Sequence, residues 1–225
     1  MTAPGLSRRL AAEAVGTALL LAAVVGSGVM AERLSGGNLA IALLANTVAT
    51  AGALVALILA FGPVSGAHLN PCVTLVLAAR GEMTWRTAAS YVAVQCGGAL
   101  AGVWTAHAMF ALPLWQAGSH VRTGAGQWLG EAVATFALLA TILGCARRTP
   151  EATPYAVAGI ITAGYWFTSS TSFANPAVTL ARAFSDTFAG IRPQDAPAFI
   201  AAQLTGAAAA AALFGWFARA ESPAR

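Results

Sequence analysis

The sequence has little charge. Charged residues make up 9% of its 225 positions, against roughly a quarter in an ordinary soluble domain. It contains no lysine, and arginine supplies all 12 basic residues. Apolar residues make up 58% of the chain, and the mean hydropathy is +0.70. This composition excludes a disordered chain, a coiled coil and most soluble enzymes, and it favours a protein that crosses a membrane several times.

Cysteine is also scarce. The three cysteines, Cys72, Cys96 and Cys145, lie in or beside apolar runs, and their odd number and spacing argue against a disulfide framework or a zinc site. No nucleotide-binding loop, metal-ligand cluster or catalytic triad is recognisable, so we expect no cofactor, no metal and no enzymatic activity. On so apolar a background, the net charge of +4 is interpreted as loop charge that orients membrane helices, not as a nucleic-acid-binding surface.

Six apolar segments are long enough to be membrane-spanning helices. They are residues 9–31, 39–61, 85–108, 127–146, 154–170 and 196–218. Cytoplasmic loops are enriched in arginine, so the loop charges predict the orientation. With the amino terminus in the cytoplasm, eight arginines fall on the cytoplasmic side and four on the other. The even number of spans places both termini in the cytoplasm, and we expect a multi-pass membrane protein.

Two further apolar segments, 66–79 and 173–184, are too short to cross a bilayer. Each carries an Asn-Pro pair, Asn70-Pro71 in the first and Asn175-Pro176 in the second. A half-length helix is tolerated at membrane depth only where it is buried in protein or faces a water-filled cavity. The sequence therefore predicts two re-entrant half-helices, one entering from each side.

The two halves of the chain repeat one another. The matching motifs, in the same order in both halves, are Glu13-Ala14-Val15 and Glu131-Ala132-Val133, Asn70-Pro71 and Asn175-Pro176, and Gln95 and Gln203. Each repeat carries three spans and one half-helix, so the second copy must be inverted relative to the first. We expect a single channel-like domain over 1–225, with repeat one at 1–108 and repeat two at 127–225.

The Asn-Pro pairs indicate what the half-helices do. Asparagine is a favoured helix N-cap, and proline is favoured at the first helical position. Two helix N-termini capped by Asn70 and Asn175 would meet near the midplane, each with unpaired N–H groups and a partial positive charge. Such a place would hold a neutral, oxygen-bearing solute and oppose a cation.

These residues resemble the major intrinsic protein family, the aquaporins and aquaglyceroporins. The resemblance covers nearly the whole chain and rests on the two signature motifs, on both glutamates and on both glutamines. It implies an all-α membrane protein of six helices and two half-helices around one pore, usually in a homotetramer. In the first motif Asn70-Pro71-Cys72, cysteine stands where the family usually has alanine; the second, Asn175-Pro176-Ala177, is regular. Passive packing of Cys72 is favoured over a thiol in the pore.

The resemblance also implies a constriction of four residues. Counting from the two motif asparagines gives Thr50, Ala163, Ser172 and Val178, with Gly164 as the alternative to Ala163. The usual arginine is replaced by Val178, so the opening is expected to be wide and to lack that cation. This pattern resembles the bacterial branch of the family associated with arsenic resistance, and that resemblance implies a location in a bacterial inner membrane.

Six other polar residues receive roles. His68 is expected to line a vestibule. Arg182, one helical turn beyond Val178, either lines the other vestibule or pairs with Asp186, and pairing is favoured. Glu13 and Glu131 are expected to accept hydrogen bonds from the re-entrant backbone. Gln95 and Gln203 are expected to bond between helices or to loop backbone.

The sequence thus predicts a passive channel for small neutral solutes: water, glycerol-like polyols, and arsenite or other trivalent or methylated arsenicals. One alternative is a strict water channel. Another, from a different class, is a proton-coupled secondary transporter that uses Glu13 and Glu131 as coupling sites.

Overall fold

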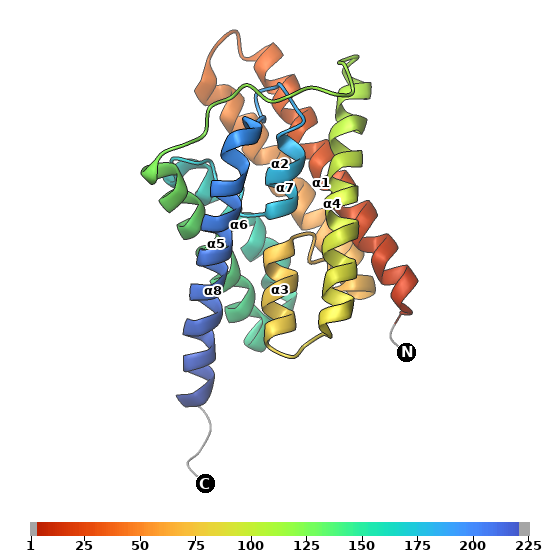
Figure 1. Ribbon diagram of the computed structural model, residues 1–225, viewed down its shortest axis with the longest axis vertical. Coiled ribbons are helices and arrows are strands. Elements are labelled where there is room, and N and C mark those ends of the chain that lie inside the picture. The colour runs from red at the N-terminus through yellow and green to blue at the C-terminus, as the bar shows by residue number, and fades with distance from the viewer. Residues whose placement is uncertain (1–3, 221–225) are drawn as a thin grey trace.

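The computed structural model describes residues 4–220, and over this range it is helical, without a β-strand (Figure 1). Two single 3₁₀ turns, Pro150–Ala152 and Pro193–Asp195, precede α6 and α8. The helices are α1 (Leu6–Leu34), α2 (Leu39–Ser65), α3 (Pro71–Ala79), α4 (Trp85–Met109), α5 (Ala125–Arg148), α6 (Thr153–Phe167), α7 (Pro176–Arg182) and α8 (Ala196–Ala220).

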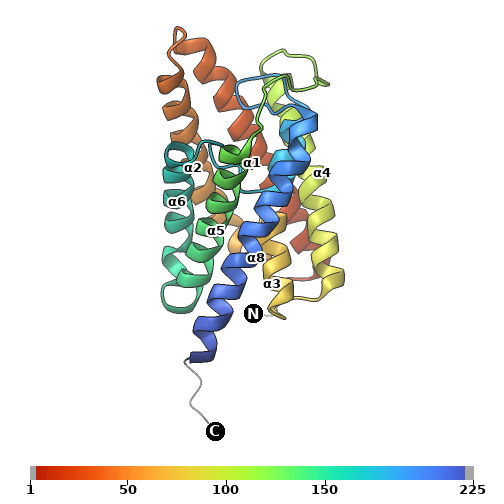
Figure 2. The same cartoon turned by 60° about the vertical axis from the view of Figure 1, so that its left-hand side comes forward.

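Six longer helices form an upright bundle around the two short ones (Figures 1 and 2). The short helices lie in opposite halves of the bundle, α3 below and α7 above in Figure 1. Helix α1 begins and α8 ends at the α3 end of the bundle. This arrangement confirms the predicted fold class of six helices with two re-entrant half-helices. The predicted cytoplasmic termini themselves lie in residues 1–3 and 221–225, outside the described part of the chain.

Within the described residues 4–220, four segments are long and apolar enough to cross a membrane by length and composition alone: α1, α2, α5 and the stretch Pro193–Arg219. The other two longer helices, α4 and α6, do not meet this criterion of length and hydropathy, for different reasons. Helix α4 carries polar residues such as Arg86, Ser90 and Gln95. Helix α6 has 15 residues, a rise of about 22 Å, because the chain leaves the helix at Thr168 and turns back into the bundle.

Glycine allows the closest helix contacts. Helix α4 packs on α1, and α8 packs on α5. A Cβ atom at Gly98 would collide with the carbonyl oxygen of Ala14, and one at Gly206 would collide with that of Ala132. Gly98 and Gly206 each lie three residues after the repeated glutamine, so the two halves bring their helices together in the same way. This backbone proximity between helices is typical of membrane bundles.

Candidate functional site

The two motif asparagines meet at the centre of the molecule and hold each other's loops. Asn70 Nδ2 donates to the carbonyl oxygen of Ala174 at 2.8 Å, and Asn175 Nδ2 donates to that of Leu69, also at 2.8 Å. Each side-chain oxygen caps its own helix, since Asn70 Oδ1 accepts from the Cys72 N–H and Asn175 Oδ1 from the Ala177 N–H. Pro71 and Pro176 occupy the first helical positions. The N-termini of α3 and α7 therefore abut, and each amide keeps a second N–H for a ligand.

The loops before the two half-helices are strained in matching places. Leu69 and Ala174, each directly before its asparagine, have φ values of 48° and 49°. Ala67 and Ser172, two residues earlier, have φ values of 45° and 53°. Non-glycine residues rarely adopt this left-handed conformation, which costs on the order of 1–2 kcal/mol each. Other contacts must therefore hold these loops in place.

The repeated glutamates supply those contacts. Glu13 accepts the N–H groups of His68 and Leu69 at 2.9 and 2.8 Å. Glu131 accepts those of Phe173 and Ala174 at 2.8 and 2.9 Å. Both glutamates are fully buried. Each carboxylate is thus the acceptor for the loop that presents the neighbouring asparagine.

The repeated glutamines complete the two networks. Gln95 Nε2 donates to Glu13 Oε2 at 2.8 Å and to Thr74 Oγ1 at 2.9 Å. Gln203 Nε2 donates to Glu131 Oε2 at 2.6 Å and to Thr179 Oγ1 at 2.7 Å. Thr74 and Thr179 lie on α3 and α7, so each glutamine ties a half-helix to the carboxylate that holds its loop.

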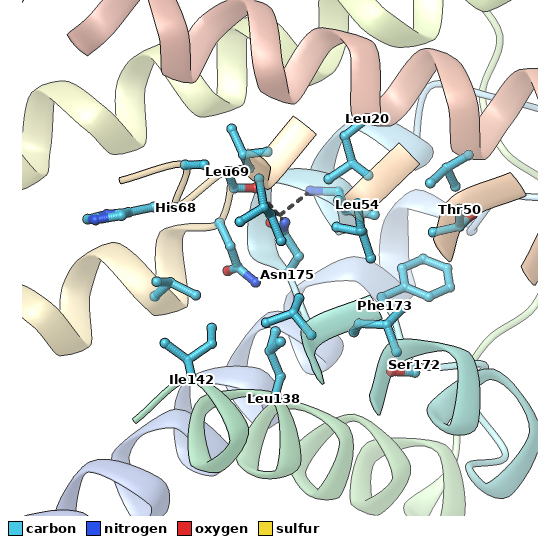
Figure 3. A pocket seen from close by; sticks show the side chains of 18 of the residues that line it. Leu20, Thr50, Leu54, His68, Leu69, Leu138, Ile142, Ser172, Phe173 and Asn175 are labelled. Atoms are coloured by element: carbon cyan, nitrogen blue, oxygen red, sulfur yellow. Dashed lines mark hydrogen bonds between the residues drawn. The ribbon is translucent and has the colours of Figure 1, made fainter. Parts of the chain in front are cut away.

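A cavity of about 240 Å³ passes beside the paired asparagines. Figure 3 shows His68 towards one end, Thr50, Ser172 and Phe173 towards the other, and Asn175 between them. Its wall is mostly apolar, with Leu20, Leu54, Leu138 and Ile142 among the lining side chains. Within residues 4–220, no aspartate or glutamate lines it. The cavity therefore offers a few fixed polar groups in an apolar passage.

Three of the four predicted constriction residues line this cavity: Thr50, Ser172 and Val178. They come from α2, from the loop after α6 and from the first turn of α7. The hydroxyl of Thr50 lies 3.3 Å from that of Tyr165, which also lines the cavity. The polar groups at the α7 end of the cavity are thus mainly hydroxyls.

The prediction that Ala163 belongs to the constriction is wrong. Ala163 is exposed and shares an outward face of α6 with Trp166 and Phe167, which are 50% and 54% exposed. The alternative, Gly164, is buried against the side chain of Ser172 and does not line the cavity. Tyr165 lines it in their place. A simple count from Asn175 fails because it crosses the irregular, partly left-handed segment 168–174.

Arg182 places a positive charge beside the constriction. Its side chain is 3% exposed and lines the cavity, four residues beyond Val178. Its Nε donates to the carbonyl oxygen of Ala189, and its guanidinium carbon lies 3.3 Å from the centre of the Phe173 ring. The cavity end therefore carries a guanidinium one helical turn beyond Val178, in agreement with the vestibule alternative for Arg182.

The favoured pairing of Arg182 with Asp186 is also wrong. Asp186 instead accepts hydrogen bonds from the backbone N–H and the hydroxyl of Ser119, at 3.0 and 2.6 Å. The Ser119 side chain and backbone hold the pKa of the Asp186 carboxyl below its usual value. Asp186 therefore fastens the long loop before α5 and leaves Arg182 to the cavity.

The other predicted vestibule residue, His68, lines the cavity near its α3 end. Its Nδ1 lies 3.1 Å from Thr74 Oγ1, and its ring stacks at a tilt on Tyr91. Cys72 is fully buried and is not among the lining residues, and neither is the fully buried Ala177. The thiol thus packs between helices and does not face the passage.

Sequence reasoning missed Phe173, Tyr165 and Arg122. Phe173 occupies the position in repeat two that His68 occupies in repeat one, two residues before the asparagine. The repeat could therefore have identified it as a lining residue. Arg122 lies in the long loop between α4 and α5, with its guanidinium carbon 5.0 Å from the centre of the Phe173 ring. No sequence pattern pointed to that contact.

Residues 1–169 match the family model described as "Major intrinsic protein". The chain is 56% identical over 211 residues to Aquaglyceroporin AqpS of Rhizobium meliloti (strain 1021), covering 94% of this chain and 90% of that protein. It is 31% identical over 241 residues to Probable aquaporin AqpM of Archaeoglobus fulgidus, covering 95% and 98%.

A solved structure gives the same fold. The aquaglyceroporin from Plasmodium falciparum superimposes with a TM-score of 0.68 at 20% sequence identity, over 95% of both chains. At that identity the likeness concerns the fold alone, and it agrees with the six helices and two half-helices seen here. Together with the family match and the full-length relatives, it shows that this chain is a multi-pass membrane protein of the major intrinsic protein family.

Proposed function

We propose that the protein is a passive channel for small neutral solutes with hydroxyl groups, above all glycerol-like polyols, and for water. One observation carries this proposal: a mostly apolar cavity presents two asparagine amides and a cluster of hydroxyls, with no carboxylate among its lining residues within 4–220. Hydroxyl and amide groups can replace the water around a polyol, while the apolar wall accepts its carbon backbone. The names of relatives such as Aquaglyceroporin AqpS support the same solute class.

The small side chains at the constriction favour a polyol over water alone. At their own three positions, Thr50, Ser172 and Val178 leave more space than aromatic or arginine side chains would, beside the Tyr165, Phe173 and Arg182 side chains that also line this end. Arsenous acid and other trivalent or methylated arsenicals that are uncharged and of similar size are proposed as further permeants on the same ground. A strict water channel would need a narrower passage at these three positions.

The proton-coupled transporter is disfavoured by the hydrogen bonds of its proposed coupling groups. Glu13 and Glu131 each accept two backbone N–H groups and one glutamine N–H, and neither lines the cavity. Each carboxylate is therefore committed to holding a re-entrant loop. A proton carrier would instead face the transport path and change its charge during each cycle.

We further propose one channel domain over 1–225, with repeats at 1–108 and 127–225, assembled as a homotetramer in a bacterial inner membrane. The duplicated Glu–Gln–Thr networks support the repeat boundaries. The α3 end of the bundle carries most of the arginines near helix ends, which supports a cytoplasmic α3 end and an outer α7 end. These arginines are Arg8, Arg9, Arg80, Arg86, Arg147, Arg148 and Arg219.

The experiment is an osmotic assay on proteoliposomes. Vesicles with and without the protein are exposed to a glycerol gradient, and swelling is followed by stopped-flow light scattering, with a second series under a pH gradient. The proposal expects glycerol uptake that does not saturate, has a low temperature dependence and ignores the pH gradient. Uphill movement of glycerol driven by protons would contradict the channel and support the proton-coupled transporter. Water flux without glycerol flux would support the strict water channel.

A further inference from the structure

Two arginines contact one phenylalanine at the α7 end of the cavity. The guanidinium of Arg182 lies 3.3 Å from the centre of the Phe173 ring, and that of Arg122 lies 5.0 Å from the same centre. Arg122 is held in place by Nε, which donates to the Gly190 carbonyl oxygen at 2.8 Å, and by its backbone N–H, which donates to Asp195 Oδ2 at 2.9 Å. Two positive charges are thus fixed around one ring.

Among the described residues 4–220, no carboxylate forms an ion pair with either guanidinium. Within residues 4–220, the side-chain bonds of Arg182 are limited to the one from Nε to Ala189, so its two terminal nitrogens have no hydrogen-bond acceptor there. The nearby carboxylates bind other groups: Asp186 binds Ser119, and Asp195 binds the Arg192 side chain and the Arg122 backbone N–H. Glu131 is close enough to attract both arginines, but it accepts the N–H groups of Phe173 and Ala174 and does not line the cavity. Burial of an uncompensated charge is strongly unfavourable. The Phe173 ring and one carbonyl offset only part of that cost.

The unpaired N–H donors belong to a side chain that lines the cavity. Arg182 is 3% exposed, yet its side chain lines the cavity, together with the hydroxyl-bearing Thr50 and Ser172. The Ser172 hydroxyl has no hydrogen-bond partner among the described residues. Val178, one turn away on the same helix, is small and uncharged. The end of the cavity therefore combines one lining cation, a second cation behind the Phe173 ring, and free N–H and O–H donors, with no carboxylate among its described lining residues.

We propose that this end of the cavity is a binding site for a small, planar, monovalent oxyanion, of which formate is the simplest. The two terminal nitrogens of Arg182 match the two oxygens of a carboxylate in a fork-to-fork contact. Arg122 strengthens binding by its charge without lining the cavity. An anion bound there occupies the mouth through which neutral solutes pass, so it inhibits their flux. This inference rests on the proposed function as a neutral-solute channel.

The test compares two sodium salts at the same ionic strength of about 0.1 M, so that screening is equal. Glycerol permeability of proteoliposomes is measured at neutral pH in formate and in isethionate, whose anion is larger and not planar, with each salt present on both sides. The expected result is a lower permeability in formate, with a saturable dependence that reaches about a twofold loss when formate equals its Kd, because half of the channels are then occupied.

Variants identify the residues that are responsible for inhibition by formate. For each protein the measured quantity is its own permeability ratio between the two salts, so differences in basal flux cancel. Arg182→Gln should bring the ratio to one, and Arg122→Gln should raise the formate concentration needed for inhibition. Arg33→Gln is the matched control, because Arg33 also stacks on a phenylalanine, Phe110, at the outer end of α1, away from the cavity. It should retain the formate effect.

Thermal melting tests formate binding to the anion site independently of the channel function. The thermal melting temperature of the purified protein should rise with formate relative to isethionate, and the rise should disappear in Arg182→Gln. If wild-type vesicles conduct no glycerol but the melting shift is present, the channel function fails and the anion site stands. Equal permeability and equal melting in both salts, or a formate effect that survives in Arg182→Gln, would overturn the anion site.

Discussion

Val178 and Arg182 lie one helical turn apart on α7, and both side chains line the cavity. Their counterparts in the first repeat, Val73 and Leu77 on α3, line it as well. Each half-helix thus presents the residues three and seven positions after its asparagine to the passage. In the first repeat both are apolar, whereas in the second the later position carries a guanidinium. The cavity is therefore polarised, with its fixed positive charge at the α7 end.

Arg182 is predicted to keep small cations out. Replacing it by glutamine removes the fixed charge that lines the passage and leaves the more distant Arg122 and the partial charges of the helix N-termini to oppose a cation. We expect Arg182→Gln vesicles to dissipate a sodium diffusion potential several times faster than wild type, measured with a potential-sensitive dye. Arg182→Lys retains the charge and should remain tight. A leak of equal size in both variants would mean that packing, and not charge, closes the channel.

Asn175→Asp is predicted to open a cation path at the centre of the channel. The amide Nδ2 of Asn175 donates to the Leu69 carbonyl oxygen, and a carboxylate in its place would face that oxygen with a negative charge. The loop contact would be lost and the positive field at the helix N-termini would be neutralised. Proton or sodium leak of the vesicles should rise. Asn38→Asp, at the exposed cap of α2, is the control and should leave the leak unchanged.

Glu131→Gln is predicted to weaken folding without altering any pH coupling of transport. The glutamine amide would place N–H donors against the backbone N–H of Phe173 or Ala174, which now donate to the carboxylate. Loss of charge-assisted hydrogen bonds in a buried site costs about 2–3 kcal/mol. The melting temperature of the purified protein should fall, while Glu82→Gln, at an exposed position, should not change it. A folded Glu131→Gln protein with an altered response to a pH gradient would instead favour the transporter.

Adjacent glycines on α4 give a test of the packing. A Cβ atom at Gly98 would collide with the Ala14 carbonyl oxygen of α1, whereas one at Gly97 has no atom within 4 Å. Gly98→Ala should therefore lower the melting temperature and the yield of folded protein. Gly97→Ala should be neutral or stabilising by up to about 1 kcal/mol, because alanine is the better helix former. Equal effects of the two substitutions would contradict the close approach of α1 and α4.

Much of the fold could be predicted from the sequence because membrane burial forces a simple pattern. Apolar length located the six longer helices, and the Asn-Pro pairs located the starts of α3 and α7 at Pro71 and Pro176. The repeat required the two half-helices to enter from opposite ends. These features follow from backbone satisfaction in lipid, which permits few alternatives.

The cavity end at α7 was harder to predict, because it depends on contacts between distant segments. The left-handed residues Thr171, Ser172 and Ala174 shift the spacing between α6 and α7, so a count chose Ala163 where Tyr165 lines the cavity. Arg182 lies near Asp186 in sequence, but Ser119 of another loop takes that carboxylate. The sequence of a helix indicates which residues share a face, but the partners of these residues depend on the tertiary fold.

The most direct measurement is the ratio of glycerol to water permeability in vesicles that contain wild-type protein or Val178→Arg. The account predicts that wild type conducts both and that Val178→Arg lowers glycerol flux by about tenfold, corresponding to roughly 1.4 kcal/mol on the barrier, with a much smaller loss for water. Val178→Ala at equal protein abundance is the control and should keep the wild-type ratio. Equal losses of glycerol and water in Val178→Arg, or a wild-type channel that excludes glycerol, would contradict it.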